Sequence, residues 1–318
     1  MGQVGDRRFA LALVFVFAQL AAGCARYGFG PASLAADTGS GSGSGQVDGA
    51  DGSSGDGDLP ATPGWVAARG TVFVAGSPPD EPCRASDESL VNIELSAFEI
   101  MPTEVTQDQF EQRMGYNPAA NAGCSDCPVE RVSWHEAAAY CNRLSTESGL
   151  QACYSCSGAQ AQTRCSSSDI AACLGYRLPS EAEWELAARA GTTTALYNGP
   201  ISVCQGQDAG AQAIGWHHPE ANARTHPVGT KAPNAWGIHD TSGNVWEWVH
   251  DWYESSRPAA SAASPLRDPF GPASGSERGI RGGSFINAPH NLRSGNREHG
   301  DPDRGSIYYG FRCARRLP

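Results

Sequence analysis

Short apolar runs with polar breaks characterise the chain after residue 65. A Val-Phe-Val run occupies residues 72–74, apolar residues alternate with polar ones over 91–95, and Phe98 and Ile100 continue the alternation. A period of two is typical of strands that bury one face. The pattern therefore predicts short strands over 72–74, 91–95 and 98–100.

Three helix starts share one signature, a hydroxyl side chain followed three residues later by Glu or Gln. In this capping box each side chain binds a backbone N–H of the other residue. The pairs are Thr106 with Gln109, Ser133 with Glu136, and Ser180 with Glu183. After Ser133, one face at helical spacing holds Trp134, Ala137, Ala138, Cys141 and Leu144. We expect this face to belong to the core.

The chain beyond Ala190 has no long periodic stretch and is rich in Gly, Pro, Asn and Trp. This texture predicts a half dominated by loops and held by aromatic packing, ion sites or disulfides. Together with the strands and helices before it, it predicts an α+β fold with low regular secondary structure. We assign this single domain to residues 65–318.

The N-terminal residues have the pattern of an export signal. Arg7 and Arg8 precede an apolar run over 9–22, which is short for a membrane span and ends in Ala-Ala-Gly before Cys24. Small residues before a cysteine resemble a bacterial lipobox, so we expect residues 1–24 to be a lipoprotein signal peptide and Cys24 to be lipidated. Ordinary cleavage or a retained anchor is the alternative.

Residues 25–64 differ in composition from the domain that follows. Gly, Ser and Asp dominate 36–60, with almost no side chain able to pack, so the segment is predicted to be a disordered linker. With a lipid at Cys24, it would tether the domain to a membrane. An aspartate directly after the lipidated cysteine would favour retention in the inner membrane. Because residue 25 is Ala, we expect delivery to the outer membrane. We therefore predict a lipid-anchored protein of the cell envelope, facing the periplasm or the surface.

Charge and cysteine content narrow the classes of function. The formal net charge is −11, from 34 acidic and 23 basic residues, which would repel phosphate backbones and excludes nucleic acid as an expected partner. The chain has 11 cysteines. If Cys24 is acylated, the other ten are even in number and can form five disulfides in an oxidising compartment.

The stretch 234–248 combines glycine turns, oxygen ligands and three tryptophans. Calcium sites in exported proteins use carboxylates and backbone carbonyls within such turns, so Asp240 and Glu247 are candidate ligands. The alternative is a turn rich in Asx residues beneath a tryptophan cluster.

That stretch is accompanied by further motifs in a fixed order. They are Glu-Val-Thr at 104–106, Val-Ser-Trp at 132–134 with Ala-Tyr-Cys-Asn at 139–142, Arg-Leu-Pro-Ser-Glu-Ala-Glu-Trp-Glu at 177–185, Arg-Gly-Gly-Ser-Phe at 281–285 and Gly-Phe-Arg at 310–312. Over residues 66–316 the chain closely resembles the formylglycine-generating-enzyme, or sulfatase-modifying-factor, family. The resemblance implies a fold related to C-type lectins and bound calcium.

Residue by residue, the resemblance implies a calcium site and a disulfide. Calcium would be held by side chains of Asp240 and Glu247 and by backbone carbonyls of Gly243 and Val245. The family's second calcium site is in doubt, because residues 213–222 depart from the pattern. The resemblance also implies a bridge between Cys141 and Cys313.

The catalytic positions differ from those of the enzymes. Formylglycine-generating enzymes oxidise a cysteine of a sulfatase with copper held by two cysteines after the Arg-Gly-Gly-Ser motif, because thiolates select Cu(I). Here those positions are Asn287 and Leu292. We therefore assign no catalytic residue and do not expect copper or formylglycine-generating oxidase activity.

The sequence gives little support to two other metals, iron and zinc. Non-haem iron, used by another branch of the family, has no support from the scattered histidines, of which only His217 and His218 are adjacent. Zinc on four thiolates would use the cysteines at 153, 156, 165 and 173, but disulfides that pin a loop are the expectation for an exported chain.

A ligand groove is the remaining candidate site. Ser284 and Trp246 match positions that line the active-site groove of catalytic relatives. The altered site is surrounded by side chains able to bind through hydrogen bonds and charge, namely Asn287, His290, Asn291 and Arg293, with Arg297 nearby. Arg293 and Arg297 could equally serve as structural ion-pair partners.

The sequence thus favours a calcium-stabilised binding or assembly module that acts on an exported protein or peptide. The alternative is an enzyme of altered mechanism, an oxidoreductase or a protein- or peptide-modifying enzyme, which would use another metal such as non-haem iron and act on an exported peptide or small molecule. Whether any catalysis remains is left open.

Overall fold

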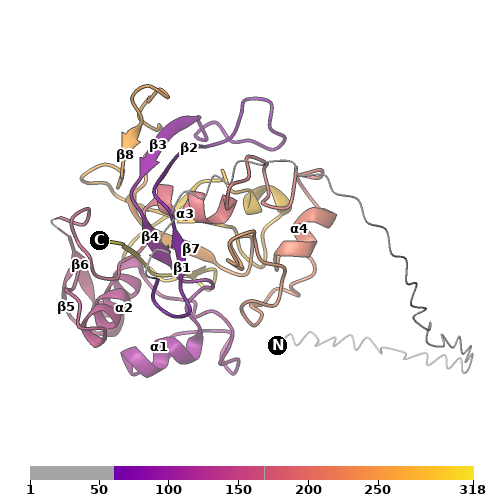
Figure 1. Ribbon diagram of the computed structural model, residues 1–318. Coiled ribbons are helices and arrows are strands. Elements are labelled where there is room, and N and C mark those ends of the chain that lie inside the picture. The colour runs from indigo at the N-terminus through magenta and orange to yellow at the C-terminus, as the bar shows by residue number, and fades with distance from the viewer. Residues whose placement is uncertain (1–60, 168) are drawn as a thin grey trace, which may run out of the picture. The chain divides into compact units, whose positions relative to one another are not determined.

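A computed structural model describes residues 61–167 and 169–318, which lie within one compact unit, Asp56–Pro318. The predicted signal peptide, Cys24 and nearly all of the predicted linker lie outside the described residues. In the part that is described, no helix is long and apolar enough to cross a membrane. The α+β domain with little regular structure is confirmed (Figure 1).

All three predicted helices form, and each begins at its capping box. Thr106 caps α1, Gln107–Met114; Ser133 caps α2, Trp134–Glu147; and Ser180 caps α3, Glu181–Arg189. In each box the hydroxyl accepts from the backbone of the third helical residue, whose own side chain accepts from the cap. Local hydrogen bonding alone therefore fixes where these helices start.

The apolar face of α2 packs into the core as predicted. Trp134, Ala137, Ala138 and Cys141 are fully buried, whereas Leu144 is half-buried at the edge of the same cluster. Short helical segments that the sequence patterns did not predict are α4, Ala209–Ile214, and two 3-10 turns, η1, Gln160–Gln162, and η2, Pro289–Leu292.

The predicted strands are confirmed as three of the twelve strands within residues 61–167 and 169–318. They are β2, Thr71–Ala75, β3, Val91–Leu95, and β4, Phe98–Ile100. The other strands are β1, Val66–Ala68, β5, Ser155–Ser157, β6, Arg164–Ser166, β7, Trp246–Trp252, β8, Leu266–Arg267, β9, Arg278–Arg281, β10, Glu298–Gly300, β11, Tyr309–Gly310, and β12, Ala314–Arg316.

The strands form three small sheets and one hairpin. The sheet orders are β2-β3-β8, β1-β4-β12 and β10-β9-β7-β11, and β5 pairs with β6 alone. Because β12 pairs with β4 and β11 runs parallel to β7, the end of the domain returns to its beginning and to its centre.

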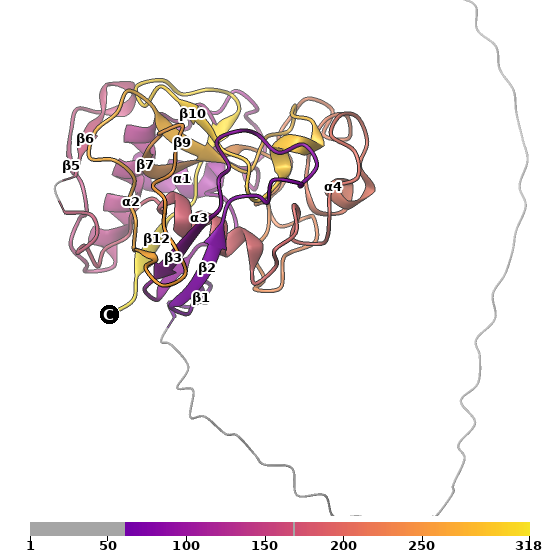
Figure 2. The same ribbon diagram turned by 90° about the horizontal axis from the view of Figure 1, so that it is seen from above.

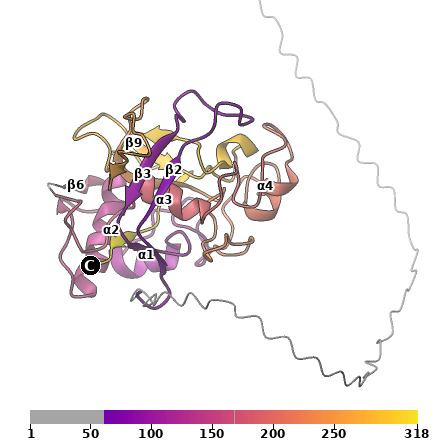
Figure 3. The same cartoon turned by 45° about the horizontal axis from the view of Figure 1, so that its top comes forward.

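Helix α3 lies between two of the sheets. It packs against β2 and β3 on one side and against β7 and β9 on the other (Figure 3). Figure 2 shows the β5-β6 hairpin beside α2 at one end of the domain and α4 at the opposite end. The first turn of α3 is thus surrounded by segments far apart in sequence.

Disulfides join all ten described cysteines. The bonds are Cys83–Cys204, Cys124–Cys127, Cys141–Cys313, Cys153–Cys173 and Cys156–Cys165. The Cys141–Cys313 bond is the pair implied by the family resemblance. The zinc alternative is wrong, because its four cysteines form two nested disulfides around the β5-β6 hairpin.

Candidate functional site

The predicted calcium site lies in a cluster of buried carboxyl groups. Glu104, just before α1, and Glu247, on β7, are fully buried, and Asp240, in the loop before β7, is 1% exposed. The guanidinium of Arg312, between β11 and β12, is buried beside them. Three carboxyl groups and one guanidinium are therefore buried together, away from solvent.

Glu247 uses both of its oxygens within the protein. Its Oε2 accepts from Arg312 Nε at 2.6 Å and from Trp184 Nε1 at 2.9 Å, and its Oε1 accepts from Arg312 Nη2 at 2.7 Å. This two-point pairing is the geometry in which Arg holds a carboxylate most firmly. A calcium ion at Glu247 would have to share the carboxylate with Arg312.

Asp240 is held differently. Its Oδ2 accepts from Gly229 N at 2.6 Å, whereas Oδ1 is buried without a partner, and the backbone is left-handed with φ +57°. Burial raises the pKa of Asp240. A buried carboxylate oxygen without a donor is costly unless a cation or a proton satisfies it.

Glu104 completes the cluster through the main chain. Its two oxygens accept from Val245 N at 3.1 Å and from the side chain of Asn244 at 2.9 Å. Burial, and then the charges of Asp240 and Glu247, raise its pKa well above the ordinary value. The negative charge is thus only partly offset by Arg312.

The residues of the cluster fit a bound calcium ion in part. The free Oδ1 of Asp240 and the excess of carboxyl groups suit a hard cation, while Glu247 is already engaged. Gly243 has φ +92°, and a Cβ there would lie 2.4 Å from the Trp216 carbonyl, so this tight turn requires glycine. Among residues 61–167 and 169–318, no three His, Cys, Asp or Glu side chains form a metal-binding group. A calcium site would need the backbone oxygens of Gly243 and Val245.

Asn287 and Leu292, the two positions at which the family resemblance would place the copper thiolates, have structural roles. Asn287 Oδ1 accepts from the hydroxyl of Ser284 at 2.6 Å and from its backbone N–H at 2.9 Å, which closes the turn after Arg-Gly-Gly-Ser. Leu292 is fully buried in an apolar cluster with Leu196 and Ile214.

Of the six predicted groove residues, three are half-buried and three are buried. Asn287, just before η2, and His290 and Asn291, on η2, are half-buried, and His290 Nδ1 lies 2.9 Å from the carbonyl of Cys204. Trp246, Ser284 and Arg293 are buried, with Trp246 in the main core cluster. Of the six predicted groove residues, those on the turn 287–291 are therefore the ones accessible to a partner.

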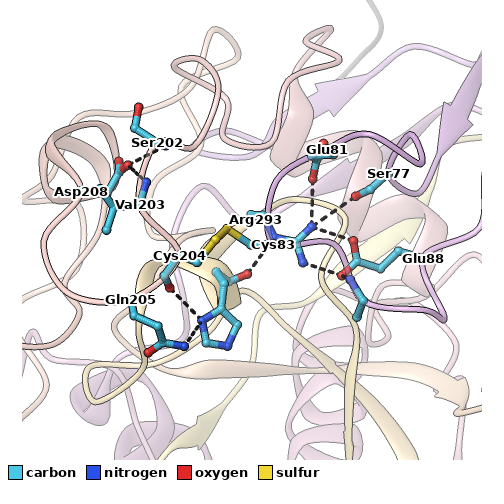
Figure 4. The surroundings of a disulfide bond; sticks show 12 residues. Ser77, Glu81, Cys83, Glu88, Ser202, Val203, Cys204, Gln205, Asp208 and Arg293 are labelled. Atoms are coloured by element: carbon cyan, nitrogen blue, oxygen red, sulfur yellow. Dashed lines mark hydrogen bonds and ion pairs between the residues drawn. A yellow bond between two sulfur atoms is a disulfide. The ribbon is translucent and has the colours of Figure 1, made fainter.

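Arg293 is an ion-pair residue rather than a groove residue. Its side chain has no exposure and binds Glu88 through Nη1 at 2.7 Å and Nη2 at 2.5 Å, with Glu81 at 2.8 Å. Burial alone would raise the pKa of Glu88, but Arg293 lowers it. Figure 4 shows this network beside the Cys83–Cys204 disulfide. Of the two predicted roles of Arg293, the structure shows the structural one.

Arg297 likewise serves as an ion-pair partner, to Glu181 at the start of α3, with Nε 2.5 Å from Oε1. Glu181 and Glu185 were not singled out from the sequence, although Arg297 was considered as an ion-pair residue. Apart from the local Glu185–Arg189 pair, the partners lie 72 to 116 residues away, beyond the reach of local spacing.

The comparisons with known proteins agree with the motifs. The family model of the sulfatase-modifying factor enzyme 1-like domain matches residues 59–317. A formylglycine-generating enzyme of Streptomyces coelicolor is 33% identical over 196 residues, 59% of this chain and 52% of that enzyme. The chain thus spans about half the length of such curated enzymes.

Two further relatives carry other names. The chaperone protein LppX of Paenibacillus barcinonensis is 36% identical over 182 residues, 51% of this chain and 65% of that protein. The solved structure of Treponema denticola variable protein 1 superposes with a TM-score of 0.66 at 30% identity, covering 79% of this chain and 94% of that one. The matched domain thus occurs in proteins with different names.

Proposed function

The chain belongs to the sulfatase-modifying factor enzyme 1-like family, and on this premise we propose that it is a binding or assembly module without copper-dependent oxidase activity. One observation carries the proposal. Where the copper thiolates would stand, Asn287 closes a turn and Leu292 fills an apolar cluster.

No other thiol in the described domain could take over the role. All ten cysteines of residues 61–167 and 169–318 are in disulfides. The amide of Asn287 and the aliphatic side chain of Leu292 contain no sulfur, so they do not hold Cu(I), which selects soft sulfur ligands.

Binding and assembly are supported by the site and by one relative. The half-buried turn 287–291 carries two amides and an imidazole. Asn287 Oδ1 and His290 Nδ1 are engaged within the protein, so the amide of Asn291 and Nε2 of His290 are the groups that would hydrogen-bond to a peptide backbone. One relative is named a chaperone, and its similarity covers about half of this chain. We propose an exported protein or peptide as the partner of this turn.

Calcium is proposed as a stabilising ion of the module. The residues that would hold it are Asp240, Glu247 and the carbonyls of Gly243 and Val245. The ion would supply positive charge against a buried acidic cluster. Asp240 Oδ1, buried without a hydrogen bond, is the observation that favours it.

The location follows from the sequence of the N-terminus. We propose that Cys24 is lipidated and that the protein is anchored in the cell envelope, at the outer membrane. Metabolic labelling with radioactive palmitate should mark the full chain and should fail with Cys24→Ser. Equal labelling of that variant would contradict the lipoprotein assignment.

Metal analysis of the purified mature chain tests the function most broadly. Calcium without a redox metal is the expected result for a binding module. Copper or iron at one equivalent per chain would contradict the proposal and would favour an enzyme of altered mechanism.

A further inference from the structure

A cavity of about 240 Å³ lies beside the first turn of α3, away from the turn 287–291. Its walls come from β3, β8, the end of β7 and the segments around 254–258 and 269–272. The wall is mostly apolar, formed by Val91, Ile93, Ala182, Trp252, Pro258, Leu266, Pro269, Phe270 and Pro272. It shares no residue with the predicted groove.

One nitrogen of a charged side chain at this wall, Nη1 of Arg257, lacks a hydrogen-bond partner. Arg257 binds Glu181 Oε1 and Glu185 Oε2, both at 3.0 Å, and uses Nη2 for both bonds. Its Nη1 is buried without any hydrogen-bond partner, and the side chain is only 10% exposed. A buried guanidinium N–H normally finds an acceptor, so a ligand whose acceptor reaches Nη1 from the cavity would satisfy it.

The charges around the cavity favour an anion. Four guanidiniums contact the carboxylates of Glu181 and Glu185, those of Arg189, Arg257, Arg281 and Arg297. Asp87 adds one negative charge, 3.8 Å from Arg297. The four bases therefore outnumber these three acids.

Asp251 is the remaining buried acid at the wall, and Glu254 is exposed. Burial, and then the charge of Glu181, raise the pKa of Asp251 to about 7. Asp251 is thus about half ionised at neutral pH, and it reduces the excess of positive charge without removing it.

We infer that this cavity binds a small monocarboxylate with an apolar body. The carboxylate accepts from Arg257 Nη1, and the body packs against Ile93, Leu266 and Phe270. The volume is below the roughly 300 Å³ at which drug-sized pockets begin, so the ligand is of the size of a single ring or a short branched chain.

Phenylacetate is a suitable probe, with phenylacetamide as its uncharged match. Titration calorimetry with the full chain should show saturable binding of phenylacetate and at least tenfold weaker binding of the amide. Equal affinity of the two, or no binding of phenylacetate at about 10 mM, tenfold above a millimolar Kd, would overturn the inference.

Two variants locate the binding. Arg257→Gln removes the donor and should weaken phenylacetate binding at least tenfold, but it also disturbs the ion pairs of Glu181 and Glu185. Leu266→Trp fills the cavity without touching those pairs and should abolish binding in a folded protein. Phenylacetate binding by folded Leu266→Trp at the original affinity would overturn the site.

Arg267→Gln is the matched control. Arg267 follows Leu266 on β8, its side chain is 78% exposed, and it pairs with Glu94 outside the cavity. Binding by this variant should equal that of the unmodified chain. A tenfold loss there would assign the effect to surface charge and overturn the role of Arg257.

Discussion

Arg312 and Glu247 form a fully buried, two-point ion pair that joins the C-terminal segment to the central strand β7. The pair spans 65 residues of sequence and lies beside two further buried acids, Glu104 and Asp240. It is therefore both a structural link and one wall of the proposed calcium site.

Removal of one partner of this pair should strongly destabilise the domain. We expect Arg312→Gln to lower the free energy of unfolding by about 3 to 5 kcal/mol, because Glu247 would remain buried and unpaired. Denaturant titration of the full chain measures the change. Arg304→Gln is the control, since its pair with Asp301 is exposed and should contribute less than about 1 kcal/mol. Equal effects of the two substitutions would contradict the account of the buried pair.

Asp240 separates the effect of calcium from that of the ion pair, because it does not contact Arg312 by a hydrogen bond. At hundredfold excess over Kd, calcium should stabilise the unmodified chain by about 2.7 kcal/mol. Asp240→Asn should lose this gain and become more stable in chelator, since it removes a buried charge whose Oδ1 has no donor.

Thermal melts in calcium and in chelator give the comparison, with the exposed Asp126→Asn as the control. Identical melting of the unmodified chain in both conditions would remove calcium from the proposal.

The disulfides should differ in their effects on stability because they close loops of different length. Cys141–Cys313 spans 172 residues and Cys124–Cys127 only 3. From loop entropy, we expect the double Cys→Ala change to cost about 5 kcal/mol for the first bond and about 2 kcal/mol for the second. Denaturant titration of the two variants tests the order. A greater loss from the Cys124–Cys127 variant would contradict it.

Asp251 should make stability fall as pH rises. Its pKa of about 7 in the folded protein exceeds the value of about 3.9 for an unfolded chain. The stabilisation linked to its proton is therefore complete below about pH 4 and is lost as pH rises to about 7. Asp251→Asn should remove up to about 1.4 kcal/mol per pH unit from this decline.

The amide oxygen of Asn can still accept from the backbone of Glu181, as Asp251 Oδ2 does at 2.8 Å. Unfolding titrations at several pH values measure the slope, with exposed Asp301→Asn as the control. An unchanged slope in Asp251→Asn would refute the assignment.

Local signals in the sequence predicted local structure well. The capping boxes at Thr106, Ser133 and Ser180 act between residues three apart, so the sequence alone located three helix starts. The alternation over 91–95 indicated β3 because only one face is fully buried. Strand β7 was not predicted, since its first six residues are all buried and leave no alternation.

Long-range pairing could not be predicted from residue patterns. Arg293 looked as suited to a groove as to an ion pair, because its partner Glu88 lies 205 residues away. The buried network of Glu181 and its arginines gave no sequence signal for the same reason. The glycine turns and oxygen ligands of 234–248, and then the family motifs, indicated Asp240 and Glu247, whereas only the structure revealed that Glu247 already binds Arg312.

A mass-spectrometric assay for aldehyde formation tests the central claim most directly. A sulfatase peptide with its cysteine in sequence context is incubated with the full chain, Cu(I) and oxygen, beside a formylglycine-generating enzyme as positive control. We predict that the peptide cysteine remains unchanged with this chain, because Asn287 and Leu292 offer no thiolate to copper. Conversion of the cysteine to formylglycine at a rate that depends on this chain would contradict the account.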